Sequence, residues 1–256
     1  MKKLLLSAII FLSYTKSFSQ TCIIVALRND TITIGADGRL GTSAMAYYKN
    51  GEKRDTIMYS TICKIRSKDN VFYTGAGTGG DIIFKYGKES IINHNGKIEI
   101  KYPFQKVTKF LETDIEKIRL KSKKVFLRDY MGEHVNFLGA LFLYFQNNTA
   151  TIYALYFKII SQSDKQVRVK ISDEYIYHKT TDRHLEIIGL GHTDAIGPYV
   201  YSVVGQYGLA KGVKRLLQFQ ADATPNEVGS PFSIVQFTPA KVNWIDTGAC
   251  NLPTNK

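Results

Sequence analysis

Two short apolar segments joined by a turn, near the beginning of the chain, restrict its fold more than any other part of the sequence. Residues 22–27 are an unbroken apolar run rich in β-branched side chains, and residues 31–34 alternate polar with apolar. The Asn-Asp pair at residues 29–30 has turn chemistry, so the pattern predicts a β-hairpin. A hydroxyl residue, Thr21, begins the first strand, and an acid, Asp37, ends the second.

The segment before this hairpin, residues 1–20, has the pattern of a secretory signal peptide. Two lysines open it, and residues 4–12 form an apolar core that is too short to span a bilayer. Ser17 and Ser19 are small residues suited to the −3 and −1 positions of a cleavage site. We therefore expect a secreted or periplasmic protein whose mature chain begins at or just after Gln20.

Composition favours a single packed domain over residues 21–256. The chain has 256 residues, 44% of them apolar, and no internal repeat or linker-like stretch divides it. Its net charge is +12, from 34 basic and 22 acidic residues, but the lysines are dispersed and no nucleic-acid recognition module is visible. We therefore expect no nucleic-acid partner, and no later stretch is long and apolar enough to predict a membrane span.

Three cysteines, Cys22, Cys63 and Cys250, leave at least one thiol free. Cys22 and Cys63 lie on predicted strands that could be neighbours, so a disulfide between them is one alternative. Burial as small apolar side chains is the other. Their spacing matches no metal site, and we expect no metal or other cofactor.

Periodicity along the rest of the chain predicts antiparallel strands separated by helices. Helices are expected at residues 81–92, 103–118 and 199–221, a polar loop at 50–55 and an irregular basic stretch at 121–133. The predicted strands cover residues 45–49, 61–66, 71–74, 135–145, 149–160, 167–172, 185–189, 233–237 and 242–245. This order fits an α+β fold in which two stacked sheets carry helices on the outside.

The first hairpin resembles the mature N-terminus of proteasome β-subunits and of the related bacterial proteasome-like peptidase. In that family the first mature residue is threonine, and an Asp-x-Arg motif closes the second strand. Thr21, Asp37 and Arg39 fit this pattern without a gap.

Two later blocks extend the resemblance over most of the chain. Residues 63–66 and 70–81 resemble the family's lysine-bearing strand, its next strand and the glycine turn before its first helix. Residues 229–235 resemble its late glycine-plus-strand block. The resemblance implies a four-layer αββα sandwich of two antiparallel sheets flanked by helices, the fold of the N-terminal-nucleophile hydrolases.

The resemblance also implies a catalytic arrangement. Thr21 is the nucleophile, and its α-amine, with an ordinary pKa of about 7.7–8.0, is the base. Lys64 keeps that amine neutral by like-charge repulsion, and Asp37 anchors Lys64. Arg39 braces the loop behind Asp37, and the N–H of Gly77 forms the oxyanion hole, because glycine lets the backbone approach the substrate closely. The expected function is the hydrolysis of peptide or amide substrates outside the cytosol, and a homo-oligomer stays an open possibility.

This sequence departs from the family pattern in three places. The stretch before Lys64 is longer than in the family, so Lys53 competes with Lys64 for the same role. The family's Gly-Ser-Gly motif is Gly-Leu-Gly here, and Leu190 cannot support the amine as a serine does; His192 could do so only with a shifted register. The family's late acid has no clean match, because Asp222 lies too far before the late glycine block.

Two other functions stay compatible with the sequence. Gly75 to Gly80 satisfies the G-x-G-x-x-G pattern between a predicted strand and a helix, and Glu99 lies about 20 residues further on, as in dinucleotide-binding proteins. That fingerprint normally opens an alternating βαβ domain, whereas antiparallel strands precede it here. A non-catalytic secreted binding module on the hydrolase fold is the second alternative, and Leu190 favours it.

Overall fold

The computed structural model describes residues 21–47, 53–77, 80–130, 136–163, 166–177 and 185–250. Two five-stranded sheets form its centre, and every strand pairing in the described ranges is antiparallel. The first sheet has the order β12 (Glu186–Gly191), β1 (Cys22–Arg28), β2 (Thr31–Asp37), β13 (Phe232–Phe237) and β14 (Val242–Asp246). The second has the order β11 (Gln166–Tyr177), β10 (Thr149–Ser163), β9 (Asn136–Gln146), β6 (Val71–Gly77) and β5 (Ile65–Lys68).

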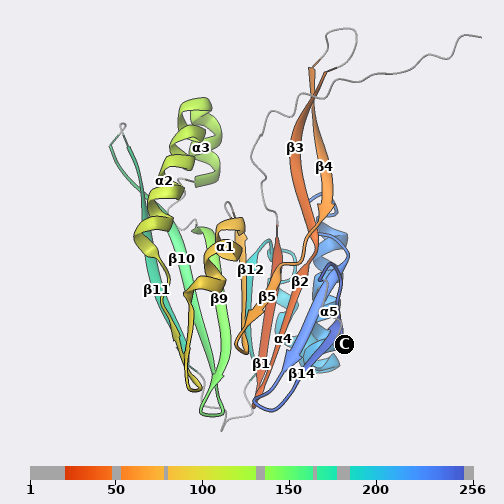
Figure 1. The fold of residues 1–256 in the computed structure, drawn as a ribbon. Helices are drawn as coiled ribbons and strands as arrows, with labels where there is room; N and C mark the ends of the chain where they lie inside the picture. Colours follow the sequence, from red (N-terminus) through yellow and green to blue (C-terminus); the bar gives the residue numbers. More distant parts are fainter. Residues whose placement is uncertain are drawn as a thin grey trace, which may run out of the picture.

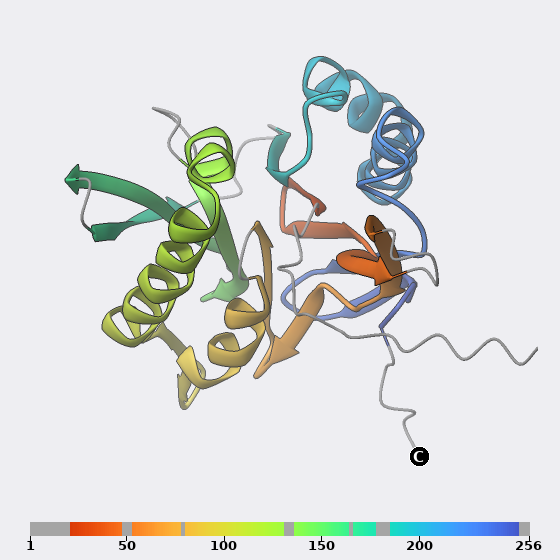
Figure 2. The ribbon, with the colours of Figure 1, turned by 90° about the horizontal axis from the view of Figure 1, so that it is seen from above.

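Helices cover the outer face of each sheet (Figures 1 and 2). The helices α1 (Gly80–Ser90), α2 (Phe104–Lys121) and α3 (Lys123–Tyr130) pack on the second sheet. The short η1 (Gly197–Tyr199), α4 (Val200–Tyr207) and α5 (Leu209–Ala223) lie on the side of the first. The prediction of an α+β chain built from antiparallel sheets is confirmed. None of the described helices combines the length and the apolarity needed to cross a membrane.

The unbroken apolar run of β1 is explained by the layers on its two sides. Ile23 and Val25 belong to the core between the two sheets, whereas Ile24 and Ala26 belong to the core beneath α4 and α5. Successive side chains of a strand point to opposite faces, so a strand covered on both faces must be apolar at every position. β1 is therefore a central strand that has no solvent-exposed face.

Two separate two-stranded ribbons complete the fold. β3 (Arg39–Tyr47) pairs with β4 (Lys53–Thr61), and in Figure 1 this ribbon rises beyond the ends of the two sheets. β7 (Ile91–His94) pairs with β8 (Lys97–Ile100). The polar loop expected at residues 50–55 is therefore wrong from residue 53 onward, where β4 begins, and residues 50–52 lie outside the described residues.

Other element boundaries also differ from the sequence-based expectations. The helix expected at 81–92 ends at Ser90, and the stretch expected to be irregular at 121–133 contains α3. The helix expected at 199–221 is broken at Gly208, whose φ of +78° no regular helix allows, and so forms α4 and α5. The long hairpin was predicted correctly: Asn147 and Asn148 at its tip have φ of 51° and 60°, as a tight two-residue turn requires.

Packing accounts for the glycines that suggested dinucleotide binding. β6 lies between β5 and β9, both antiparallel to it, so no parallel βαβ unit surrounds the motif in the described structure. A Cβ on Gly75 would lie 2.8 Å from the Ile83 side chain of α1. Gly75 therefore allows α1 to pack closely on β6, and the dinucleotide-binding alternative is not supported.

Candidate active site

The carboxylate of Asp37, at the end of β2, is the centre of a buried hydrogen-bond cluster. Its Oδ1 accepts the backbone N–H of Cys22 at 2.8 Å and the Lys64 ammonium at 2.9 Å, and its Oδ2 accepts the N–H of Arg39 at 3.2 Å. Only 1% of Asp37 is exposed. One carboxylate oxygen thus joins Lys64 to the amide that directly follows Thr21.

Lys64 reaches this carboxylate from an irregular stretch between β4 and β5. Its Nζ also donates to the backbone oxygen of Arg39 at 2.7 Å, and its own backbone oxygen accepts the hydroxyl of Thr74 at 2.7 Å. The competing candidate, Lys53, pairs in register with Tyr47, eight positions along the ribbon from the Arg39–Thr61 pair. At the rise of an extended strand this is roughly 25 Å away, so Lys53 cannot take the place beside Asp37.

Burial has the largest influence on the protonation of this ion pair. It raises the pKa of the Asp37 carboxyl above its ordinary value, against the opposing effects of Lys64 and of two backbone N–H groups. It lowers the pKa of the Lys64 ammonium, against the attraction of Asp37. Each charge is therefore tolerated in the core only because the other is beside it.

Thr21 lies at the start of β1, fully buried, and is held on both sides by neighbouring strands. Its carbonyl oxygen accepts the backbone N–H of His192 at 2.7 Å, and the next residue binds Asp37. A Cβ on Gly191, where φ is +83°, would lie 1.9 Å from that oxygen and 3.1 Å from the methyl carbon of Ala76. Glycine is required there because the end of β12 lies close to both the Thr21 carbonyl and Ala76 of the second sheet.

Gly77 follows Ala76 at the end of β6 and has a φ of +112°. A Cβ at this position would lie 2.2 Å from the backbone oxygen of Phe137 on β9. The chain therefore needs glycine here for conformation and for space. The oxyanion role that the family resemblance implies for the Gly77 N–H stays a prediction.

Arg39 joins the site to the loop that precedes β13. Its guanidinium carbon lies 5.0 Å from the centre of the Tyr59 ring, and its Nη1 donates to the backbone oxygen of Pro225. A Cβ on Gly229 would lie 2.4 Å from the guanidinium carbon, so that glycine makes room for Arg39. The hydroxyl of Tyr59 donates to the backbone oxygen of Asn226 at 3.0 Å. Arg39 therefore braces residues 225–229.

The residues at which the sequence departs from the family pattern have defined positions. Leu190 is 7% exposed and packs in the core between the sheets, against Gly139. The Nδ1 of His192 pairs with Glu227 at 2.9 Å, while Asp222 lies on α5 and accepts the side-chain amide of Gln218. Glu227, which the sequence analysis did not single out, lies between Asp222 and the late glycine block. In the described ranges, no group of three or more His, Cys, Asp or Glu side chains could hold a metal ion.

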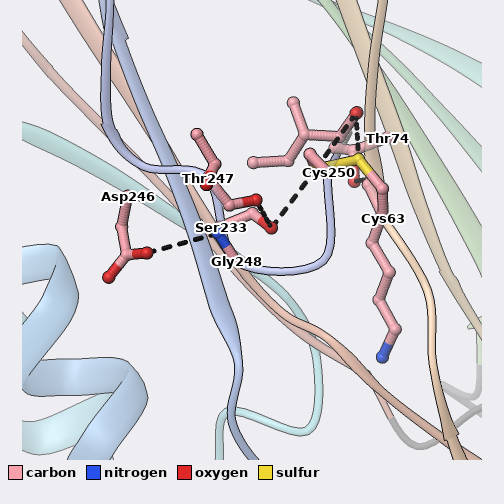
Figure 3. The surroundings of a disulfide bond; sticks show 9 residues. Cys63, Thr74, Ser233, Asp246, Thr247, Gly248 and Cys250 are labelled. Carbon is pink, nitrogen blue, oxygen red and sulfur yellow. Dashed lines mark hydrogen bonds between the residues drawn. A yellow bond between two sulfur atoms is a disulfide. The ribbon is translucent and has the colours of Figure 1, made fainter. Parts of the chain in front are cut away.

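A disulfide bond joins Cys63, the residue before Lys64, to Cys250 near the end of the described chain. Figure 3 shows it beside Thr74 and Ser233. The third cysteine, Cys22, is a buried free thiol whose pKa is raised by burial first and by Asp37 second. The pairing of Cys22 with Cys63, considered from the sequence, is therefore wrong, because the partner of Cys63 comes from a distant segment.

No protein-family model and no curated protein matches this sequence. Among solved structures, Thiobacillus denitrificans BPH in complex with Epoxomicin aligns with 86% of this chain and 100% of its own, at 12% sequence identity and a TM-score of 0.40.

Proposed function

We propose that this protein is an exported hydrolase of peptide or amide bonds, with the N-terminal-nucleophile hydrolase fold and with Thr21 as its first mature residue. The observation that supports the proposal is the buried Asp37–Lys64 pair, bonded through one carboxylate oxygen to the amide that follows Thr21. A core ion pair is costly and rarely improves stability over apolar packing, so its position at the start of β1 favours a chemical role.

The proposed chemistry begins once residues 1–20 are removed. Until then the Thr21 nitrogen belongs to a peptide bond and cannot accept a proton. As a free amine beside the Lys64 cation it has a lowered pKa and stays neutral near pH 7. The Thr21 hydroxyl then attacks the substrate carbonyl carbon and passes its proton to this amine, while the N–H of Gly77 stabilises the oxyanion. The C–N bond breaks, the leaving amine takes the proton, and water hydrolyses the resulting ester.

Two routes lead to an N-terminal threonine. A signal peptidase that cuts after Ser19 leaves Gln20 in place, and the folded protein must then remove it, with the Thr21 hydroxyl attacking the preceding carbonyl. A cut after Gln20 needs no second step. Either route gives a mature domain that begins at Thr21, and export would place it in the periplasm or the medium.

A peptide epoxyketone tests the proposal, because it needs both a hydroxyl and a neighbouring amine to form its six-membered ring. The exported protein is expected to start at Thr21 by intact mass and to gain the full mass of the probe, since nothing leaves in this reaction. Thr21→Ala should gain none and should retain Gln20 under the self-processing route. Thr31→Ala, at the other end of the hairpin, is the matched control and should react as the wild type does.

The second candidate function is a non-catalytic binding module on the same fold. It is favoured by Leu190 at the place of a supporting hydroxyl and by the complete burial of Thr21. The same experiment separates the two functions. An exported wild-type protein that keeps Gln20 and gains no mass from the probe would leave the binding module as the better description.

A further inference from the structure

The backbone that carries Lys64 lies outside the sheets. β4 ends at Thr61 and β5 begins at Ile65, so the three residues between them have no strand pairing. The N–H of Ile62 donates to the backbone oxygen of Gly38 at 2.9 Å, and Thr74 holds the backbone oxygen of Lys64. A short irregular segment of this kind depends on its few attachments to hold an ammonium group in one place.

The disulfide to Cys250 is one of these attachments, and it leads to a folded turn at the C-terminal side of β14 (Figure 3). In that turn the N–H of Cys250 donates to the backbone oxygen of Thr247 at 2.7 Å, which also accepts the hydroxyl of Ser233 at 3.0 Å. The N–H of Gly248 donates to the Asp246 carboxylate at 3.2 Å. The turn is therefore anchored on β13 and β14.

The same turn also lies against the backbone beside Asp37. Phe232 of β13 pairs in register with Asp37, and a Cβ on Gly38 would lie 2.4 Å from the backbone oxygen of Pro231 and 3.3 Å from the methyl carbon of Ala249. Asp37 is thus fixed to this region by strand pairing and close packing. The disulfide fixes the segment before Lys64 to the same region.

We propose that the Cys63–Cys250 disulfide is a positioning element that holds the Lys64 ammonium against Asp37, so that the competence of the site depends on the oxidised state. This inference rests on the proposed function. A dithiol would transfer two electrons to the bond, giving two cysteine thiols and its own disulfide. Cys63 and Cys250 are 8% and 6% exposed, so such reduction is expected to be slow in the folded protein.

The test compares the wild type with the variant Cys63→Ala/Cys250→Ala, using short peptide aminomethylcoumarin amides as the activity probe. Circular dichroism first establishes that the variant is folded at the assay temperature. A displaced Lys64 is expected to lower kcat by roughly 10- to 100-fold, with little change in KM. The acidic limb of the rate profile should move to higher pH, because the amine pKa returns toward its ordinary value of about 7.7–8.0.

The labelling rate of Cys22 supplies a readout that needs no activity. Its thiol is buried and its N–H is bound to Asp37, so it is protected while the Asp37 cluster is intact. The alkylation rate of Cys22 in the folded variant should rise several-fold, and wild type treated with dithiothreitol should approach the same rate. Dithiothreitol should leave the variant unchanged, which controls for other effects of the reductant.

The outcomes distinguish this inference from the proposed function. A folded variant with wild-type kcat, pH profile and Cys22 labelling would show that the disulfide does not position Lys64. A wild type that hydrolyses no amide, but whose Cys22 labelling rises when the disulfide is removed, overturns the hydrolase proposal and leaves the positioning role supported. Unchanged Cys22 labelling in that case overturns both.

Discussion

Two of the regions in which carboxylates accept backbone N–H groups differ in their surroundings. At the start of β1, Asp37 binds two N–H groups and is 1% exposed. At the outer edge of the second sheet, Glu112 and Glu116 of α2 accept the N–H groups of Val169 and Val167 at 3.0 and 3.2 Å. These glutamates are partly exposed. The same kind of hydrogen bond is therefore made in the core in one region and near the surface in the other.

Access to solvent determines how the carboxylate charge is stabilised in each region. Asp37 has lost its hydration and is paired with a buried ammonium from another part of the chain, because an isolated charge in the core is very costly. Glu116 pairs with Arg119 of its own helix, three residues away, and water completes the solvation of both. β11 is an edge strand, and the two glutamates cover N–H groups that could otherwise pair with another chain. The buried Asp37 cluster has the properties of a functional site. Glu112 and Glu116 form a surface clip, which has a structural role because it covers the edge of β11.

Removing the cation from each region should give the largest contrast. Lys64→Met leaves the Asp37 carboxylate buried without a partner, and the free energy of unfolding should fall by about 3–5 kcal/mol. Arg119→Met should change it by less than about 1 kcal/mol, because Glu116 keeps access to water. Urea unfolding measures both differences.

The double variant Asp37→Asn/Lys64→Met keeps this comparison testable if the single variant does not fold. It removes both buried charges, and the asparagine oxygen can still accept the N–H of Cys22, so much of the lost stability should return. Amide hydrolysis should stay absent. A Lys64→Met protein as stable as the wild type would contradict the assignment of this pair as a buried ion pair.

Two glycines with positive φ allow the same comparison, between the buried site and an open position, to be made on the backbone. Gly191 has φ +83° and lies against the Thr21 carbonyl, whereas Gly96 has φ +89° with nothing within 4 Å of an added Cβ. Gly96→Ala should cost about 1–2 kcal/mol, the cost of the left-handed conformation alone. Gly191→Ala should cost more by roughly 1–3 kcal/mol, because the added carbon must displace Thr21. Thermal unfolding measures the loss of stability in each variant, and probe labelling checks whether Thr21 is displaced. Equal losses of stability at the two positions would contradict the close contact between Gly191 and the Thr21 carbonyl.

Sequence reasoning located the parts of this site whose pattern is local. The β-branched run, the Asn-Asp turn and the acid at Asp37 lie within one hairpin, and the structure places that hairpin at the centre of the first sheet. The partner of Asp37 could not be read from periodicity, because the long β3–β4 ribbon separates it from Lys64. The resemblance to a known family suggested Lys64, and the 2.9 Å contact is the observation that brings the two together.

The remaining misses come from contacts between distant segments. Cys63 and Cys250 are 187 residues apart, and no local pattern indicates their pairing. α3 was missed because its basic residues suggested an irregular stretch, although Phe126 and Tyr130, four residues apart, are buried on one face of a helix. The contact of Glu112 with β11 was not predicted, since a sequence cannot show that the edge of β11 lies beside α2.

Removing the surface clip should have a smaller effect than any change at the buried site. Glu112→Ala/Glu116→Ala leaves the N–H groups of Val167 and Val169 to water, so each lost bond should cost about 0.5–1.5 kcal/mol. Hydrogen exchange at these two amides should become faster, while the amide of Leu141 in the central strand β9 keeps its protection. If the two valine amides exchange at the wild-type rate, the glutamates do not cover the edge of β11.

Acidification should loosen the clip by the smallest amount of all. The hydrogen bond from Arg119 is the main cause that lowers the pKa of Glu116 below its ordinary value of 4.5, and the N–H of Val167 acts in the same direction. A carboxyl whose pKa is lower in the folded state contributes stability above its unfolded pKa, and this contribution is lost as the pH falls through the folded value. The protection factor of the Val167 amide should therefore decrease below pH 4.5, relative to that of Leu141. Glu116→Gln keeps an acceptor oxygen but does not titrate. In this variant the ratio of the Val167 protection factor to that of Leu141 should change less with pH. The same decrease in wild type and variant would show that Glu116 is not the titrating group, and that the edge of β11 responds to acid through another residue.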